Sequence, residues 1–517
     1  FILAIVNCYV YQFRCIPLIP TDLKSTTTAL AVLDHYAISL VMQSAIGICF
    51  FITNMVTILS FSKQLAGKKR TIKRRLYNIS MAVGLIAIIQ IPFSNLLKPT
   101  IDIVTITWNV QEGYWKYGYL LGSIKNLKES KIIKPDSFDK IIDIIENLEN
   151  SDSVPKESEF PDIILIVNES YFDLYSISNI QTSKKPTEFI DSLENVKRGY
   201  VVNPNTVTAN SEFEILTSNS IELLNGVTAF THFSCENLNS IVKNLIELNY
   251  DTYAIHPAPA ENYRRADVYL ELGFQNLNWL SDFPEDVERI RDYPSDAACF
   301  DKIIELYEAE NKNRNKFIYN LTLQNHGNYD IGMENIDIKV LGQDVDASKK
   351  DFAEEYLNSL HYTDKAFKKL IEYFECIDKP VIICMIGDHA PNFAGELANI
   401  EFSCDEEKIV KTKSTPFVLW ANYPIEAEDF GYSSMIYAGA KLFKTAGLPL
   451  TGYQKYLLKM EEVWPIVTVG ICGDGKNFYS SEKDIINKEY LDNYFALEYN
   501  NIKEAQGSYY DFYNYSK

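Results

Sequence analysis

Charged residues are absent from long stretches near the start of this 517-residue sequence. No Asp, Glu, Lys or Arg occurs from His35 to Ser62, and a second uncharged stretch runs from Leu76 to Leu97. Each run is long enough to cross the apolar core of a bilayer as one helix, and a buried helix of a soluble protein rarely lacks charge for so long. The sequence therefore predicts two membrane-spanning helices, with Phe1–Phe13 as the tail of a third, truncated span.

Basic residues are scarce relative to acidic ones. The chain has 49 Lys and Arg against 69 Asp and Glu, which gives a formal net charge of −20. Such a balance argues against nucleic acid as a partner. The nine cysteines form no CxxC pair and have no regular spacing, so they indicate neither a zinc knuckle nor a disulfide framework.

The loop between the two uncharged runs fixes the expected orientation in the membrane. Lys68–Arg75 carries six basic residues, and a short basic loop stays in the cytoplasm. Counting spans from there places Arg14–Asp34 outside and everything after about residue 98 outside again. A cleavable signal peptide does not fit, because no small-residue cleavage site follows the apolar runs. We therefore expect a multi-pass protein of the cell membrane whose large C-terminal part is extracellular.

We predict four regions along the chain: a transmembrane region (1–97), a juxtamembrane helical connector (98–157), a large α/β domain (158–440) and a C-terminal subdomain (441–517). The connector contains one clear helical stretch, Phe138–Leu148. After it, short apolar runs alternate with amphipathic stretches, which is typical of a sheet with helices on both faces. The predicted strands are Pro161–Val167, Tyr253–Ile255, Lys316–Leu323, Val381–Ile386 and Pro416–Trp420; the predicted helices are Leu238–Leu248, Ala298–Asn311 and Asp351–Phe374.

Polar residues gather where these predicted strands end. In open α/β sheets the ligand site lies outside the carboxyl ends of the strands, so we expect these groups to share one site. They are Asn168-Glu169-Ser170, His256-Pro257 with Tyr263, Arg264 and Arg265 soon after, Gln324-Asn325-His326-Gly327, and Gly387-Asp388-His389-Ala390-Pro391, together with the polar cluster Thr206–Glu212.

The residue types in these groups indicate metal-assisted chemistry. Glu169, Asp388 and His389 form a mixed oxygen and nitrogen ligand set that suits Mn²⁺, Mg²⁺ or Zn²⁺. A bound cation can activate a hydroxyl such as that of Thr208, which is otherwise a poor nucleophile. Each residue alone has an ordinary structural explanation, and their joint occurrence at successive strand ends is what favours a site.

Cationic groups and hydrogen-bond donors for an anionic substrate are present at the same strand ends. His256, Arg265 and His326 are suited to surround the non-bridging oxygens of a phosphoryl group. The chain has six histidines. The other three outside the metal set, His35, His232 and His361, show no comparable setting and are expected to be structural.

The order and spacing of four motifs resemble those of the lipoteichoic acid synthase family, which belongs to the alkaline phosphatase and sulfatase superfamily. The motifs are Asn168-Glu169-Ser170, Thr208-Ala209-Asn210-Ser211-Glu212-Phe213-Glu214, Gln324-Asn325-His326-Gly327 and Gly387-Asp388-His389-Ala390-Pro391. The resemblance covers nearly the whole chain. It implies an alkaline-phosphatase-like α/β fold, with a mostly parallel sheet flanked by helices and preceded by N-terminal transmembrane helices, and it makes 158–440 the catalytic domain.

The resemblance also implies an activity. Members of the family move glycerophosphate from phosphatidylglycerol, through a threonine intermediate, onto a cell-envelope polymer or glycan. Carried over by position, Thr208 matches the nucleophile. Glu169, Thr208, Asp388 and His389 match the ligands of one divalent cation, Mn²⁺ or else Mg²⁺. The residues that match the head-group contacts are His256, Tyr263, Arg265 and His326.

Three departures from the family pattern bear on this expectation, and three alternative functions are compared with it. Tyr263 stands where a member of the family has Trp, 203–206 lack the glycines expected in many relatives, and Cys15 replaces the Gly that is common after Phe-Arg. Sulfatase activity is rejected, because the nearest approach to the nucleophile motif Cys-x-Pro-x-Arg of sulfatases, Cys15–Ile19, has no Arg. A phosphoethanolamine transferase and a non-catalytic, membrane-tethered protein that binds head groups stay as alternatives. The general acid is His326 or His256.

Overall fold

The structure, a computed structural model, describes chiefly residues after 131. These are 132–155, 160–203, 207–224, 228–232, 234–260, 262–309, 314–330, 332–333, 336–342, 347–480, 488–504 and 509–515, with only 6–7, 18, 52–53, 55, 118–119 and 121–123 before them. The chain divides into two compact units, one of Phe1–Pro20 with Asp34–Lys128 and a second of Thr21–Leu33 with Glu129–Lys517. The sheet, its flanking helices and the candidate site all belong to the second unit.

The predicted membrane spans at 1–13, 35–62 and 76–97 fall almost wholly outside the described residues. Within the part of the chain that the structure describes, no helix combines the length and the apolar character needed to cross a bilayer. The spans therefore stay predictions, as does the division of the chain into four regions.

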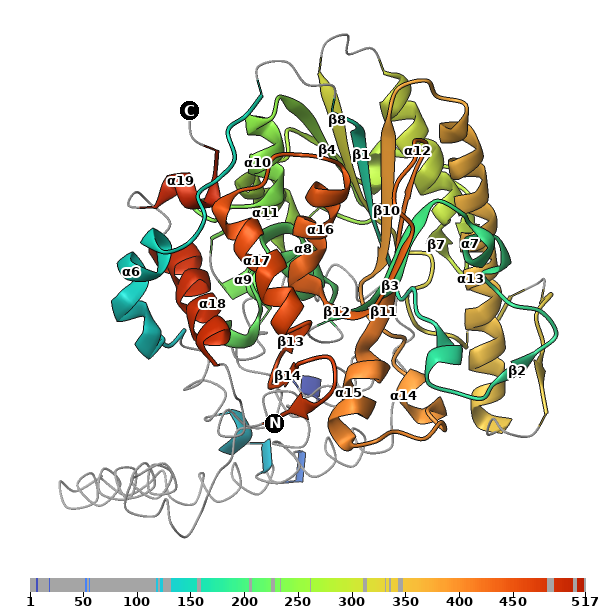
Figure 1. Cartoon of the computed structure of the whole chain (residues 1–517). Coiled ribbons are helices and arrows are strands. Elements are labelled where there is room, and N and C mark those ends of the chain that lie inside the picture. The colour runs from blue at the N-terminus through green and yellow to red at the C-terminus, as the bar shows by residue number, and fades with distance from the viewer. Residues whose placement is uncertain are drawn as a thin grey trace, which may run out of the picture. The chain divides into compact units, whose positions relative to one another are not determined.

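An eight-stranded sheet forms the centre of the second unit, in the order β12-β3-β11-β10-β1-β8-β4-β5 (Figure 1). All neighbouring pairs are parallel except those that β11 makes with β10 and β3. The expected mostly parallel sheet is confirmed, with β11 as its one reversed strand. The strands are β1 (Asp162–Asn168), β3 (Val196–Val202), β4 (Tyr250–Ile255), β5 (Asn276–Asn278), β8 (Asn315–Leu321), β10 (Val381–Gly387), β11 (Ser414–Ala421) and β12 (Glu428–Ser434).

Helices cover both faces of this sheet, as Figure 1 shows. Every residue of β1 is buried, because alternate side chains of the strand enter two different cores. Ile163 and Leu165 pack in the core that contains α8 (Thr208–Thr217), α10 (Ile241–Glu247), α11 (Arg265–Leu272) and α16 (Ala438–Thr445). Ile164 and Ile166 pack in the core that contains α7 (Glu188–Ser192), α12 (Asp296–Glu308) and α13 (Ala347–Glu375).

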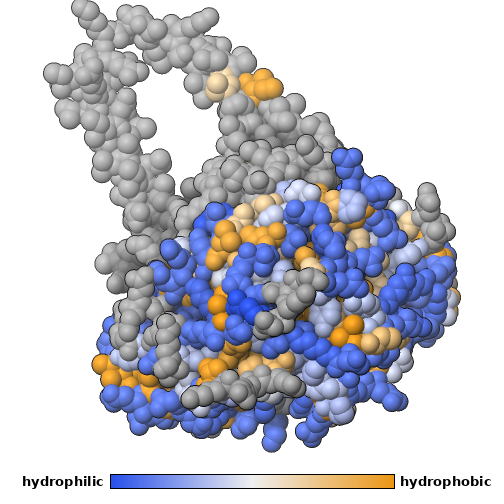
Figure 2. Space-filling view, turned by 90° about the horizontal axis from the view of Figure 1, so that it is seen from above, coloured by the Kyte–Doolittle hydropathy of each residue, from blue (hydrophilic) through white to orange (hydrophobic). Residues whose placement is uncertain are grey.

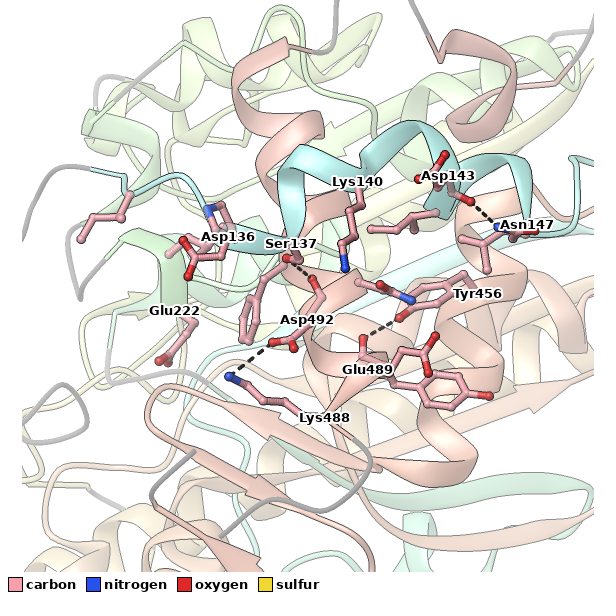
Figure 3. Close-up of a pocket in the computed structure, with 18 residues that line it drawn as sticks. Asp136, Ser137, Lys140, Asp143, Asn147, Glu222, Tyr456, Lys488, Glu489 and Asp492 are labelled. Carbon is pink, nitrogen blue, oxygen red and sulfur yellow. Dashed lines mark hydrogen bonds and ion pairs between the residues drawn. The ribbon is translucent and has the colours of Figure 1, made fainter. Parts of the chain in front are cut away.

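A third core joins two parts of the chain that are far apart in sequence. The connector elements η4 (Asp136–Lys140) and α6 (Ile141–Glu146) pack against the C-terminal helices α17 (Gly452–Val463), α18 (Glu489–Tyr499) and α19 (Tyr510–Tyr513). Ser137 donates a hydrogen bond of 2.7 Å to the carbonyl of Asp492 across this junction (Figure 3). The cavity of 1120 Å³ beside it is lined mainly by polar side chains and by none of the predicted site residues.

Short elements complete the described part. They are β2 (Gln181–Thr182), β6 (Arg289–Ile290), β7 (Tyr293–Pro294), β9 (Val340–Leu341), β13 (Ile466–Thr468), β14 (Ile471–Gly473), β15 (Phe478–Tyr479), α9 (Ala229–His232), α14 (Ala394–Leu397), α15 (Asp405–Lys413), η5 (Leu174–Ser176), η6 (Glu222–Leu224), η7 (Asn262–Arg264), η8 (Leu280–Asp282), η9 (Met435–Tyr437) and η11 (Asn500–Glu504). The face of the molecule seen in Figure 2 is mainly hydrophilic where it is coloured, with small groups of hydrophobic residues on it.

All five predicted strands and all three predicted helices of the α/β part are present. Strand β8 ends at Leu321, two residues before the predicted end, and the predicted helix Phe138–Leu148 is divided into η4 and α6. The prediction missed β3, β5 and β12. β3 (VKRGYVV) is only partly buried, and β12 is an edge strand with an irregularity between Asp429 and Tyr432, so neither carries the apolar run that marks a central strand.

Gly387, the last residue of β10, lies where the backbone of another segment passes very close. A Cβ at this position would be 2.0 Å from the carbonyl oxygen of Tyr171 and 2.8 Å from Cβ of Thr415. Only glycine fits at this position. The absence of a side chain allows the end of β10 to lie directly against the segment after β1.

We expect Gly387→Ala to lower the free energy of unfolding by at least about 2 kcal/mol, because a backbone carbonyl cannot move aside as a side chain can. Thermal unfolding of the purified full chain measures the change. Gly395→Ala is the matched control, since no atom lies within 4 Å of the added Cβ and Gly395 is exposed. Equal melting temperatures for the two variants would contradict the steric argument.

Two acidic side chains are fully buried between α8 and α18. Glu214 Oε2 and both carboxyl oxygens of Glu498 have no hydrogen-bond partner among the described residues. Burial raises the pKa of Glu214 to about 8 and that of Glu498 well above its ordinary value. The folded chain therefore holds protons that the unfolded chain releases near pH 4.3.

Because these two carboxyl groups hold more protons in the folded state, their contribution to stability should fall as pH rises from about 4.3 to 8. We expect Glu214→Gln to remove on the order of a few kcal/mol of this decrease, since the amide keeps an acceptor for the Ile221 amide and carries no charge. Melting temperatures of the variant and the parent between pH 5 and 8 make the comparison. Parallel curves for the two proteins would show that Glu214 ionises normally.

Candidate metal centre and active site

The carboxyl ends of β1 and β10 bring two acidic residues side by side. The two strands are parallel, and their register ends with Asn168 opposite Gly387. Glu169 and Asp388 are the next residues along each strand, so they leave the sheet at the same level. Both side chains are buried, with exposed fractions of 2 % and 0 %.

Thr208 reaches the same edge from β3. It is the first residue of α8, which begins shortly after that strand ends. Ser211, one turn into the helix, donates a hydrogen bond of 2.6 Å to the carbonyl of Asp388 and so ties the start of α8 to the end of β10. Thr208 itself is half-buried, which leaves its hydroxyl accessible to a substrate.

Four predicted ligand atoms surround one point at this edge. His389 Nε2 lies 3.2 Å from Asp388 Oδ2, 3.6 Å from Glu169 Oε1 and 3.5 Å from Thr208 Oγ1. Ligand atoms of Glu169, Asp388 and His389 all lie within 4.8 Å of one another, which is the spacing of groups that could hold one metal ion. The structure thus brings together the four residues that the sequence motifs assign to a metal.

Hydrogen bonds behind these atoms orient them. His389 Nδ1 lies 3.1 Å from the carbonyl oxygen of Ala390, which can only accept, so Nδ1 carries the hydrogen and Nε2 has the lone pair. Asp388 Oδ1 accepts from the amides of Ser170 and His389 at 2.7 and 2.8 Å. Asp388 Oδ2 is buried and accepts no hydrogen bond from the described residues. A lone-pair nitrogen and an unbonded carboxylate oxygen that face each other fit a cation between them.

The charges at the site also favour a cation. Burial and the neighbouring Glu169 carboxylate raise the pKa of Asp388 to about 7. Burial acts to lower the pKa of His389, but the carboxylates of Asp388 and Glu169 outweigh it and raise the pKa. A divalent ion would supply the positive charge that these carboxylates otherwise take from protons.

His256 follows β4 and is held as a neutral ring. Its Nδ1 lies 3.1 Å from the carbonyl oxygen of Leu321, so Nδ1 carries the hydrogen. Burial lowers the pKa of His256 well below its ordinary value, and the charges of Arg265 and His326 lower it further. His256 and Arg265 both belong to the segment that follows β4, and His326 belongs to the loop after β8.

Arg265 is bound to the helix that carries Thr208. Its Nε and one terminal nitrogen donate to Glu212 Oε1 at 2.9 and 2.6 Å, and both side chains are buried. Glu212 Oε2 accepts from the hydroxyls of Tyr269 and Tyr319. The guanidinium lies 5.0 Å from the centre of the Tyr263 ring, so the two predicted head-group residues are in contact. Glu212 thereby links the position of Arg265 to the helix of the predicted nucleophile.

The residues of the motif Gln324-Asn325-His326-Gly327 have two different roles. Gln324 accepts from the amide of Asp296 and donates to the carbonyl of Ser359, and Asn325 donates to Asn168 Oδ1. These two amide side chains are buried anchors of the loop. His326 is half-buried and is the member of the motif that can meet a substrate.

Several hydrogen bonds that hold the site were not predicted from the sequence. Glu169 receives a hydrogen bond of 2.8 Å from Ser170 Oγ, its amide donates to Thr322 Oγ1, and Thr415 Oγ1 donates to the carbonyl of Gly387. Ser170 belongs to a motif that the sequence analysis named, and Thr415 directly precedes the predicted strand Pro416–Trp420, whereas Thr322 lies inside the predicted strand Lys316–Leu323 and gave no signal. His361 lies on α13 with Nδ1 near the carbonyl of Pro186, outside the site.

Residues 161–448 match the sulfatase family, and this segment is more than half of the chain. The chain therefore belongs to the sulfatase family, with the α/β fold of the alkaline phosphatase superfamily. This membership confirms the predicted resemblance to lipoteichoic acid synthases, which belong to the same superfamily.

Solved structures share this fold. Streptococcus pyogenes phosphoglycerol transferase GacH, solved with sn-glycerol-1-phosphate, is 20 % identical with a TM-score of 0.54, over 73 % of this chain and 92 % of that one. Lipoteichoic acid synthase LtaP from Listeria monocytogenes is 17 % identical with a TM-score of 0.50, over 71 % of this chain and 98 % of that one.

A relative from Rhizobium meliloti (strain 1021) is provisionally named a cyclic beta-1,2-glucan modification protein. It is 24 % identical over 418 residues, which are 77 % of this chain and 64 % of the relative. The chain thus spans less than two thirds of that relative's length.

We expect Asp388→Asn to weaken Mn²⁺ binding by about 10- to 100-fold or more, because the change removes a negative ligand oxygen from the cluster. Calorimetric titration of the full chain with Mn²⁺ measures the affinity, and the rise of the melting temperature with Mn²⁺ measures it a second way. Asp429→Asn, an exposed substitution on β12, is the control. Unchanged binding in Asp388→Asn would place the metal elsewhere.

Proposed function

We propose that this chain is a membrane-anchored, metal-dependent phosphoglycerol transferase. Its donor would be phosphatidylglycerol, and its acceptor a polymer or glycan of the cell envelope. The proposal rests on the sulfatase-family fold, the motif resemblance to lipoteichoic acid synthases and the geometry of the site. The single observation that carries it is the Thr208 hydroxyl 3.5 Å from Nε2 of His389, beside the carboxylates of Glu169 and Asp388.

The proposed ligand set is Glu169, Thr208, Asp388 and His389, with Mn²⁺ as the expected ion and Mg²⁺ as the substitute. When bound, such an ion would favour the alkoxide of Thr208 and stabilise negative charge on the phosphate. Two backbone amides hold Asp388 through its other oxygen, Oδ1, and the Ser170 hydroxyl donates to Oε1 of Glu169, the oxygen that faces His389. The set of oxygens with one imidazole suits these ions.

The chain's own residues would carry two displacements. Oγ of Thr208 attacks phosphorus in line, the bond from phosphorus to the diacylglycerol oxygen breaks, and the departing oxygen takes a proton. An acceptor hydroxyl then attacks the same phosphorus and restores the threonine. Arg265, His256 and Tyr263 would surround the glycerophosphate, with Arg265 held in place by Glu212.

His326 is the better proton donor of the two open choices. The depressed pKa of buried His256 keeps that ring neutral, and its one hydrogen is committed to the carbonyl of Leu321. His326 is half-buried, so its ring is accessible to a leaving oxygen. We therefore assign the general acid to His326 and head-group binding to His256.

The location of the enzyme belongs to the same proposal. The uncharged runs 35–62 and 76–97 would anchor the chain in the cell membrane, and 98–157 would connect them to an extracellular catalytic domain at 158–440 with the subdomain 441–517. Phosphatidylglycerol lies in the membrane to which such a domain would be tethered. No nucleic acid is expected as a partner.

We expect Thr208→Ala to reduce release of diacylglycerol from phosphatidylglycerol by at least about 10³-fold, because the covalent route is lost. The assay uses the full chain in mixed micelles with Mn²⁺. Thr208→Ser, which keeps a hydroxyl, should retain part of the activity, and equal melting temperatures would exclude unfolding.

Three outcomes of this assay separate the alternatives. Full activity in Thr208→Ala would refute the nucleophile assignment. Consumption of phosphatidylethanolamine in place of phosphatidylglycerol would identify a phosphoethanolamine transferase. Binding of glycerophosphate with no turnover of any phospholipid would identify a non-catalytic head-group-binding protein.

A further inference from the structure

The hairpin of β6 and β7 has an unusual turn. Ile290 pairs with Tyr293, so only Arg291 and Asp292 form the connection. Both residues have positive φ, 53° and 67°. This conformation is typical of Asn-Gly or Asp-Gly in two-residue hairpins and is unfavourable for a long side chain such as arginine.

Arg291 is nevertheless buried, with an exposed fraction of 6 %, although it lies at the tip of a turn. Asp292 beside it is exposed. A strained residue persists only where its surroundings stabilise it, and such residues cluster at functional sites. The contacts of the Arg291 side chain show what stabilises it.

The guanidinium of Arg291 binds three carbonyl groups of one loop. It donates to the carbonyls of His326 at 3.0 Å, of Gln324 at 3.4 Å and of Asn328. It also lies 4.6 Å from the centre of the Tyr329 ring. These residues form the loop after β8, which carries the proposed general acid.

A carboxylate on α13 completes the arrangement. Glu355 Oε1 accepts from Arg291 at 2.6 Å, and Glu355 Oε2 accepts from the amide of Gly332 at 2.8 Å. Both members of this ion pair are buried. The pair therefore holds the backbone at residues 324, 326, 328 and 332 and fixes it to α13.

The hairpin contributes a second contact to the same loop. The Tyr293 hydroxyl donates to the carbonyl of Gly327 at 3.0 Å and lies 3.3 Å from Nδ1 of His326. His326 Nδ1 in turn lies 2.7 Å from the carbonyl oxygen of Gly327. That oxygen can only accept, so Nδ1 carries the hydrogen, and a proton taken up or given by the ring moves at Nε2.

We propose that Arg291 is a positioning residue, which holds the backbone around His326 so that its imidazole keeps one orientation and one tautomer. The inference rests on the proposed function, since it assigns Arg291 to the transfer step through His326. It explains why the turn has arginine where asparagine or glycine would be easier. Arg291 does not itself touch the reacting atoms.

The test replaces Arg291 without disturbing the turn. Asparagine tolerates positive φ, so Arg291→Asn keeps the hairpin and removes the guanidinium. Glu355→Gln is combined with it so that no unpaired buried carboxylate remains. Asp292→Asn is the matched control, because it changes the neighbouring turn residue, whose side chain is exposed.

We expect the double variant Arg291→Asn with Glu355→Gln to lower kcat by about 10- to 100-fold with little change in KM, since a misplaced catalytic group loses rate more than binding. Asp292→Asn should keep the parental kcat. In a His326→Ala background the double variant should have no further effect, because the residue that it positions is already gone. A purely structural role would lower kcat by the same factor in both backgrounds.

An activity-independent measurement separates this inference from the proposed function. The two nitrogens of a neutral imidazole have distinct ¹⁵N resonances, and His326→Ala identifies the His326 signals. The parent should show a single tautomer with the hydrogen on Nδ1, and the double variant a mixture of both. One unchanged tautomer in the double variant, or equal effects in the two backgrounds, would overturn the inference. A parent that transfers no glycerophosphate would refute the proposed function, and the ¹⁵N spectra would still decide the role of Arg291.

Discussion

The parallel pairing of β1 with β10 is the constraint on which the rest of the site depends. It places Glu169 and Asp388 at the same level, so two buried carboxylates lie close together, with His389 within 3.6 and 3.2 Å of their oxygens. The repulsion between them is what makes a divalent cation chemically suited to this edge of the sheet. Helix α8 then delivers Thr208 to the same point and is tied there by Ser211. The positions of the proposed nucleophile and of the proposed metal ligands are therefore all fixed by the same strand ends.

A common arrangement recurs around this unit. Two of the side chains that would meet the substrate, Arg265 and His326, depend on a buried side chain from another element. Glu212 holds Arg265, and Arg291 holds the loop of His326. Both Glu212 and Arg291 belong to buried ion pairs, Arg265–Glu212 and Arg291–Glu355, where an unpaired partner would be costly, so each pair favours one geometry. Side chains held in this way suit phosphoryl transfer, because that reaction depends chiefly on positioning and on charge.

The sequence analysis found the parts of the fold whose signals are local. β1 and β10 are continuous apolar runs, and each is followed at once by polar residues, so both the strands and the predicted ligands could be located without coordinates. β3 and β12 escaped because half-exposed and edge strands have no such run. The reversed direction of β11 escaped because direction is set by pairing and leaves no mark in composition.

The sequence by itself determined the strand-end motifs, the family resemblance and the candidate nucleophile, because these depend on residue types within a few positions of one another. Only the tertiary structure decided that Glu212 holds Arg265 and that Arg291 holds the loop of His326. Those partners are 53 residues apart in the first case and 35 in the second. Contacts at such separations arise from strand order and helix packing, which no local pattern of residues specifies.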